Sequence, residues 1–213
     1  MISHKYKFIY IKVAKTGSQT IIQTLRNHVH DLVLETYRKH YIKNFDFDPH
    51  HISSFDIQKK LPNEFDQYFK FAFARNPWDR LVSIWSMNKL RRNFKCTFPL
   101  HIPDFPEFIK SLYSLDWMPK ENIYRGCNKK YFNYTFGNVS DFAKESNFIG
   151  KIENFEKDFK YVCDKIGIPR QELPRRNKTN HKHYTEYYDD ETREIVAEKY
   201  AKDIENFGYE FGE

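Results

Sequence analysis

The stretch Tyr6–Leu25, YKFIYIKVAKTGSQTIIQTL, decides how the rest of the chain is interpreted. It begins with a run rich in β-branched and aromatic residues from Phe8 to Val13. Ala14–Gly17 then follow without periodicity, and apolar residues recur at helical spacing as far as Val29. This order predicts a buried strand, a tight turn and a helix that runs to about residue 30.

Such a turn directs unpaired backbone N–H groups and the positive end of the helix dipole to one point beyond the strand. Lys15 adds a full positive charge, and Thr16, Ser18 and Thr20 add hydroxyl donors. The stretch therefore predicts a site for an anion with several oxygens, with phosphate as the first candidate. The simpler alternative is a strand–loop–helix unit in which the lysine is only solvated.

The turn departs from the G-x-x-x-x-G-K-[ST] loop of nucleoside triphosphatases, because Lys15 precedes Gly17 instead of following it. The Ser or Thr that would bind Mg²⁺ in such a loop is therefore not in its usual place. This favours a nucleotide that binds without a metal ion over ATP or GTP.

Composition agrees with one α/β domain that spans residues 1–213. Hydrophobic residues make up 40% of the chain and aromatic residues 18%, so most aromatic rings are expected in the core. The net charge of +6 suits an anionic ligand. Because the basic residues are scattered along the chain, we expect no nucleic-acid partner.

The three cysteines are far apart and odd in number, which predicts neither a disulfide framework nor a zinc site. No apolar run is long enough to span a membrane, and no signal peptide precedes the first strand. We therefore expect a cytoplasmic protein, or a Golgi-lumen protein only if the sequence is truncated. Nothing in the sequence indicates the oligomeric state.

A second strand–turn–helix unit begins at Phe69–Ala74, FKFAFA, which predicts a central parallel strand. Arg75 again places a basic residue at the end of the strand. Asn76 suits the N-cap of a helix and Pro77 its first position, and apolar spacing continues to about Arg92.

The remaining pattern predicts one more strand and four more helices. The strand is Phe148–Ile152; the helices run from Ser53 to Pro62, through residues 106–112, from a cap at Asn154 to Ile166, and from Asp189 to Phe207. The rest of the range 93–147 is poor in pattern, which predicts an irregular insertion. Strands that alternate with helices predict an α/β fold in which a central parallel sheet is flanked by helices in three layers.

The stretches VAKTGSQT (Val13–Thr20) and FARNPWDRLVS (Phe73–Ser83) together resemble sulfotransferases that use 3′-phosphoadenosine 5′-phosphosulfate. The closer resemblance is to the carbohydrate-type, family-2-like members, whose loops read roughly P-K-T-G-[GS]-[TS] and R-[DN]-P-x-x-R-x-x-S. It continues through residues 50–53, 148–153 and 181–188. Ala14 departs from the pattern, since the family often has proline there.

The resemblance implies a P-loop-like sulfotransferase fold and a metal-independent enzyme with 3′-phosphoadenosine 5′-phosphosulfate as co-substrate. The residues that would hold its 5′-phosphosulfate are Lys15, Thr16, Gly17, Ser18, Gln19 and Thr20. Arg75 and Ser83 would bind the 3′-phosphate. The alternatives are an Arg75 that simply pairs with Asp79, and a Ser83 that is only a solvated helix residue.

In such an enzyme the acceptor oxygen attacks sulfur in line with the leaving phosphate. Lys15 is our choice for stabilising the leaving group, and His51 for the base that removes the acceptor proton. His50, His181 and His183 are alternative bases. The acceptor implied is a carbohydrate hydroxyl, expected near residues 89–134, and the role of the basic loop 175–183 stays open.

Two other functions are compatible with parts of the sequence. One is a P-loop-type kinase, which would need Mg²⁺ and a different loop. The other is a non-enzymatic binder of acidic polysaccharide or nucleic acid, which would show steep salt dependence. Binding of adenosine 3′,5′-bisphosphate separates all three.

Overall fold

The computed structural model describes residues 1–28, 52–91, 104–113, 134–173 and 182–213. They belong to two compact units. Unit 1 comprises Met1–Ala74 and Val139–Arg176, and unit 2 comprises Arg75–Asn138 and Asn177–Glu213. The predictions for His50, His51, His181 and most of the basic loop 175–183 lie outside the described residues.

Unit 1 is built on a four-stranded sheet in the order β1-β2-β3-β4. The strands are β1 (Ile2–Ser3), β2 (Phe8–Tyr10), β3 (Phe69–Ala74) and β4 (Phe148–Lys151). β2, β3 and β4 run parallel, with Tyr10 opposite Phe71 and Phe73 opposite Gly150. The predicted parallel sheet is confirmed, and the antiparallel edge strand β1 is an addition that the sequence pattern did not predict.

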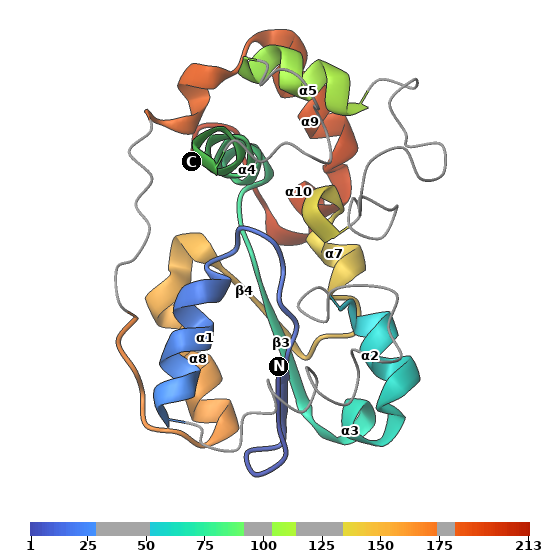
Figure 1. The fold of residues 1–213 in the computed structure, drawn as a ribbon, viewed down its shortest axis with the longest axis vertical. Helices are drawn as coiled ribbons and strands as arrows, with labels where there is room; N and C mark the ends of the chain where they lie inside the picture. Colours follow the sequence, from blue (N-terminus) through green and yellow to red (C-terminus); the bar gives the residue numbers. More distant parts are fainter. Residues whose placement is uncertain (29–51, 92–103, 114–133, 174–181) are drawn as a thin grey trace. The chain divides into compact units, whose positions relative to one another are not determined.

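Helices cover both faces of this sheet, as Figure 1 shows. Phe71 and Phe73 join one core cluster with α1 (Ser18–His28) and α8 (Phe155–Ile166). Lys70 points to the other face, where its Nζ donates to the Phe65 carbonyl of α3 (Pro62–Gln67) at 2.6 Å. Burial lowers the pKa of Lys70. α2 (Ser54–Lys60) precedes α3, so the predicted three layers are confirmed within unit 1.

The caps of these helices test the local predictions. The Ser53 hydroxyl accepts from the Asp56 N–H at 3.2 Å, so the predicted start of α2 is confirmed. Gly167 ends α8 with φ of 72°, also as predicted. Asn154 occupies the N-cap position of α8, as predicted, but its side chain makes no capping hydrogen bond, and the 3₁₀ turn η4 (Ile152–Asn154) leads into the helix.

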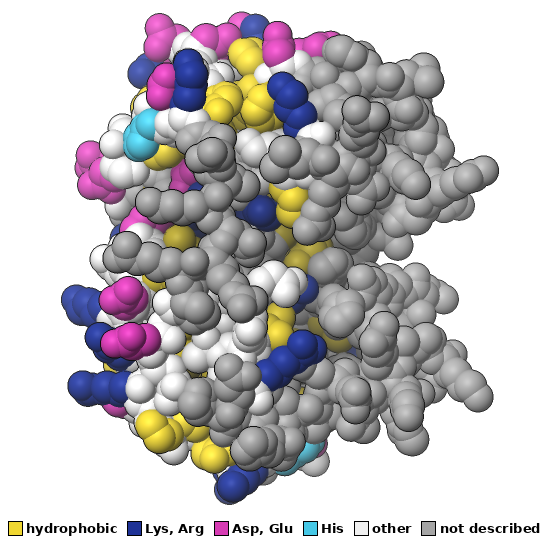
Figure 2. Space-filling model, turned by 60° about the vertical axis from the view of Figure 1, so that its left-hand side comes forward, with side chains coloured by type: hydrophobic (Ala, Val, Ile, Leu, Met, Phe, Trp, Pro, Cys, Tyr) yellow, Lys and Arg dark blue, Asp and Glu magenta, His cyan; other side chains and the backbone are white. Residues whose placement is uncertain are grey.

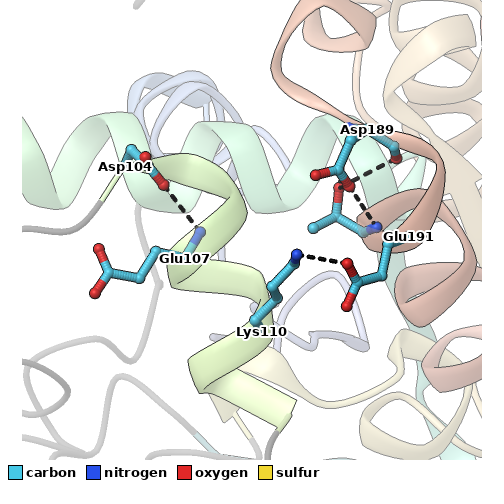
Figure 3. A network of polar contacts seen from close by, with 6 residues as sticks. Asp104, Glu107, Lys110, Asp189 and Glu191 are labelled. Atoms are coloured by element: carbon cyan, nitrogen blue, oxygen red, sulfur yellow. Dashed lines mark hydrogen bonds and ion pairs between the residues drawn. The ribbon is translucent and has the colours of Figure 1, made fainter.

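Unit 2 is helical and packed around aromatic rings. It contains α4 (Pro77–Arg91), α5 (Phe105–Tyr113), η5 (Tyr184–Tyr187), α9 (Asp190–Lys199) and α10 (Ala201–Phe207). The Phe105 ring lies 4.8 Å from that of Tyr188 and 5.7 Å from that of Trp85. Lys110 of α5 binds Glu191 of α9 at 2.5 Å, and Figure 3 shows this pair near the capping contacts of Asp104 and Asp189.

The single last helix predicted from Asp189 to Phe207 is instead two helices. The break falls at Tyr200, whose buried hydroxyl donates to the Phe136 carbonyl at 2.5 Å. The helix predicted through residues 106–112 is confirmed as α5, whereas the short α7 (Val139–Phe142, in unit 1) lies in the part of the range 93–147 that was expected to be irregular. The predicted role of that range on the acceptor side stays a prediction.

Two negative findings apply to the described residues only. None of their helices combines the length and apolarity needed to cross a membrane. Their cysteine, Cys163, is a free thiol buried in the core of unit 1.

Candidate functional site

The loop after β2 has an unusual backbone. Lys15 and Gly17 both have left-handed conformations, with φ of 63° and 71°. Such conformations are uncommon for a lysine and persist where the surrounding structure fixes them. α1 begins directly after Gly17, whose carbonyl accepts from the N–H groups of Thr20 at 3.0 Å and Ile21 at 3.2 Å. The first N–H groups of α1 therefore lie next to Lys15, an arrangement that favours an anion.

Hydroxyl groups inside this loop fix its shape. Thr16 Oγ1 donates to the Val13 carbonyl at 3.2 Å, and Ser18 Oγ donates to the same carbonyl at 2.7 Å. Thr16 is fully buried, and Ser18 and Thr20 are only 7% and 6% exposed. In this conformation Thr16 and Ser18 thus hold the turn together, a role that the sequence did not indicate.

Gly17 is also required by close packing. A Cβ atom at this position would lie 2.8 Å from Ile152 Cδ1 and 2.8 Å from Phe155 Cζ. Phe155 in turn meets Phe73 of β3 edge to face, with ring centroids 5.2 Å apart. The loop is therefore clamped against η4 and the start of α8. Sequence reasoning missed Ile152 and Phe155 as supports of the loop, because a core contact has no local signal.

The loop after β3 begins with an ion pair. Arg75 Nε and Nη2 each lie 2.7 Å from Asp79 Oδ2, and the two side chains are only 19% and 24% exposed. The pairing considered from the sequence is therefore present. Any phosphate at this position would meet a guanidinium that is already oriented by a carboxylate.

Asn76 caps α4, as predicted, and also anchors a distant segment. Its Oδ1 accepts from the Trp78 N–H at 3.1 Å, and its Nδ2 donates to the Glu210 carbonyl at 2.9 Å. The Tyr184 hydroxyl accepts from the Gly212 N–H at 2.6 Å. Burial raises the pKa of Tyr184, which keeps its hydroxyl neutral. Residues 209–213, which we call the C-terminal strap, thus hold the start of α4.

Ser83 lies on α4 and is 3% exposed, so it is not the solvated helix serine of the alternative interpretation. Arg80, one turn earlier, is 1% exposed and donates to the carbonyls of Gly137 at 2.9 Å and Thr135 at 3.0 Å. This second arginine of the R-N-P-W-D-R stretch is therefore a structural residue of unit 2.

The structure brings the residues from Lys15 to Thr20 together in unit 1, with Gln19 exposed, and places Arg75 and Ser83 in unit 2. That both loops hold one nucleotide stays a prediction. The alternative base His183 is exposed, and its Nδ1 lies 2.8 Å from Thr185 Oγ1. No group of three or more metal-binding side chains occurs within the described parts of the chain.

Among the described residues on the face that Figure 2 draws, basic side chains are scattered, and toward the left and the top of the view they lie next to acidic ones. A parallel sheet whose strands lead into basic turns is typical of α/β proteins that bind phosphate-containing ligands. These features are typical of an α/β protein that binds a phosphate-containing ligand. Comparison with known proteins then identifies the family.

A model of the sulfotransferase family matches residues 1–210, so the chain belongs to this family and is an enzyme of the sulfotransferase class. It is 34% identical over 116 residues to an uncharacterized protein of Archaeoglobus fulgidus, covering 54% of this chain and 78% of that protein. The chain is also similar to the crystal structure of a sulfotransferase from Alicyclobacillus acidocaldarius. The match covers 93% of this chain and 92% of that protein, with 16% sequence identity and a TM-score of 0.43.

Proposed function

We propose that this chain transfers a sulfuryl group from 3′-phosphoadenosine 5′-phosphosulfate to a carbohydrate hydroxyl. The observation that carries the proposal is the first loop, in which two left-handed residues, Lys15 and Gly17, precede the N-terminus of α1. Membership of the sulfotransferase family supplies the class of reaction.

In the proposed reaction, a bond forms between the acceptor oxygen and sulfur while the bond from sulfur to the bridging oxygen breaks. The electron pair stays on the 5′-phosphate, and the acceptor proton passes to a base. Lys15 and the N-terminus of α1 stabilise the charge that develops on the phosphate. His51 is the proposed base, and it lies outside the described residues.

Arg75 and Ser83 are proposed to bind the 3′-phosphate. β2 and β3 are parallel neighbours, so their carboxyl ends leave the sheet of unit 1 at one edge, and Arg75 directly follows the last residue of β3. Ligands of parallel α/β sheets bind at this edge. The Arg75–Asp79 pair supports the assignment by giving the guanidinium a defined orientation.

Calorimetry with adenosine 3′,5′-bisphosphate, without added metal, is the first test. The proposal expects saturable binding at one site. Absence of binding would overturn it. Binding of ATP that requires Mg²⁺ would favour a kinase, and only salt-sensitive binding of polyanions would favour a non-enzymatic binder.

Transfer of labelled sulfate then tests the individual roles. Lys15→Ala is expected to lower kcat about 10²–10³-fold, as the loss of an oxyanion donor does. His51→Ala is expected to lower kcat about 10²–10⁴-fold while nucleotide binding survives. His183→Ala is the matched histidine control and is expected to keep wild-type kcat. If the two histidine variants exchange behaviour, His183 is the base.

A further inference from the structure

The Tyr184 hydroxyl lies at the centre of a polar network in unit 2. It accepts from the Gly212 N–H at 2.6 Å and donates to the Glu213 carbonyl at 3.1 Å. Asn76 Nδ2 contacts the same oxygen at 3.4 Å, the longest of the three distances. A tyrosine hydroxyl has one proton to donate and lone pairs that accept. One side chain therefore binds the strap at two points and also meets the cap of α4.

Asn76 is the second member of this network and is 1% exposed. Its Oδ1 accepts from the Trp78 N–H in the first turn of α4, and its Nδ2 donates to the Glu210 carbonyl at 2.9 Å. Tyr184 thus acts on Asn76 in two ways, directly and through the strap, because Glu210 lies two residues before Gly212. Buried polar groups that satisfy one another form a rigid unit.

Asn76 stands between the two residues of the proposed 3′-phosphate site. Arg75 directly precedes it, and the Arg75 guanidinium lies 2.7 Å from Asp79, which is in the first turn of the helix that Asn76 caps. Ser83 follows Asp79 by about one turn of the same helix. The position of the start of α4 therefore affects both residues of the site.

We propose that Tyr184 is a positioning residue for the 3′-phosphate of the nucleotide. Its hydroxyl holds the strap and the amide of Asn76, and Asn76 in turn holds the start of α4 beside Arg75. Tyr184 acts only through these groups and does not contact the nucleotide. The inference rests on the proposed function, because it requires a 3′-phosphate at the second loop.

Tyr188 offers a matched control. Its hydroxyl also binds the start of α4, where it donates to the Trp78 carbonyl at 2.9 Å. Its ring meets Phe211 edge to face at 5.5 Å, as the ring of Tyr184 does at 5.6 Å. Tyr184→Phe and Tyr188→Phe each remove one hydroxyl and keep the ring on Phe211, but only Tyr184→Phe removes contacts with Asn76 and the strap.

Calorimetry with adenosine 3′,5′-bisphosphate, and displacement of this nucleotide by adenosine 5′-phosphate, give two dissociation constants for each variant. Their ratio measures what the 3′-phosphate adds to binding. Tyr184→Phe is expected to weaken binding of the bisphosphate about 3- to 10-fold and that of the 5′-phosphate less than about 2-fold. Tyr188→Phe is expected to keep the wild-type ratio. Both variants are expected to lower the melting temperature by about 2–6 °C, so a loss of stability alone does not predict the difference.

Asn76→Ser, alone and combined with Tyr184→Phe, tests the route of the effect. Serine keeps a capping oxygen but lacks the amide that meets Glu210 and Tyr184, so the ratio is expected to fall at least as far as in Tyr184→Phe. Because Tyr184 acts through Asn76, the double variant is expected to bind the bisphosphate like Asn76→Ser.

The proposal is overturned if Tyr184→Phe keeps the wild-type ratio, if Tyr188→Phe lowers the ratio as much, or if the effect of Tyr184→Phe persists in full beside Asn76→Ser. Should Tyr184→Phe fail to fold, Asn76→Ser decides, and an unchanged ratio overturns the proposal. If wild type does not bind the bisphosphate, or binds it no more tightly than the 5′-phosphate, the proposed function fails first, and the two failures are thereby distinguished.

Discussion

The two loops that lead from β2 and β3 into helices are stabilised in different ways. The first is fixed by its own backbone and by close apolar packing, because Gly17 has a left-handed conformation and packs against Ile152 and Phe155. The second is fixed by polar contacts, because the amide of Asn76 binds the carbonyl of Glu210.

This difference indicates which kind of substitution should destabilise each loop most. The first loop has no room for an added atom, so we expect it to respond to steric change. The second loop depends on a cap and on the C-terminal strap, so we expect it to respond to changes far from Arg75. The variants below test this contrast, beginning with the largest expected effect on the free energy of unfolding.

Gly17→Ala is expected to have the largest effect. The new methyl group would overlap Ile152 and Phe155, and the left-handed backbone would add strain, for a combined loss of about 2–4 kcal/mol in urea denaturation. Gly167→Ala is the matched control, because Gly167 has φ of 72° but no atom within 4 Å of an added Cβ. Its expected loss is about 1 kcal/mol. Equal losses would show that packing does not constrain the first loop.

Asn76→Ala is expected to come next, because it removes the cap of α4 and leaves the Glu210 carbonyl without its amide donor. Together these changes are expected to cost about 2–3 kcal/mol. Asn76→Ser keeps a capping oxygen but cannot reach as far, so it separates the cap from the link to the strap. If Ser restores full stability in urea denaturation, the link contributes nothing.

Phe211→Ala removes the ring of the strap that meets Trp78 and Tyr188 edge to face, each at 5.5 Å. The ring is half-buried, so the expected loss is about 1–2 kcal/mol. Affinity for adenosine 3′,5′-bisphosphate is expected to fall more than affinity for adenosine 5′-phosphate, because only the former uses the second loop. Phe55→Ala, at a ring that is 69% exposed, is the control and is expected to change neither quantity.

Asp79→Asn is expected to have the smallest effect. The Arg75–Asp79 pair is partly exposed, so its loss should cost less than about 1 kcal/mol of stability. Because Asp79 orients the guanidinium of Arg75, Asp79→Asn is expected to weaken binding of the bisphosphate slightly in calorimetry. Tighter binding would mean that the negative charge of Asp79 opposes the phosphate more than its contact with Arg75 helps.

Local sequence signals predicted most of the framework. The apolar run of β3, the Ser53 and Asn76 caps and the Gly167 stop were all confirmed. Predictions failed where distant contacts decide the backbone. Tyr200, bonded to Phe136, interrupts a periodic helical pattern, and Asn154 stands at the N-cap of α8 without the expected side-chain hydrogen bond.

The features of the candidate site also fall into those that local sequence predicts and those that it does not. The tight turn after the first strand, with the charge of Lys15 at the start of a helix, could be predicted from the order of strand, turn and helix. The hydroxyl bonds to Val13, the contact of Gly17 with Phe155 and the strap on Asn76 could not, because none of them leaves a pattern in neighbouring residues. They depend on residues that only the folded chain brings together.

The ammonium group of Lys70 closes the corner between α3 and β3, where it donates to the carbonyls of Phe65 and Tyr68. Its lowered pKa means that the unfolded chain holds this proton more tightly than the folded protein does. Raising the pH toward 10.5, the ordinary pKa of lysine, should therefore increase the contribution of this group to the free energy of unfolding. Most proteins lose stability in this alkaline range. In Lys70→Met this alkaline gain in the free energy of unfolding should disappear.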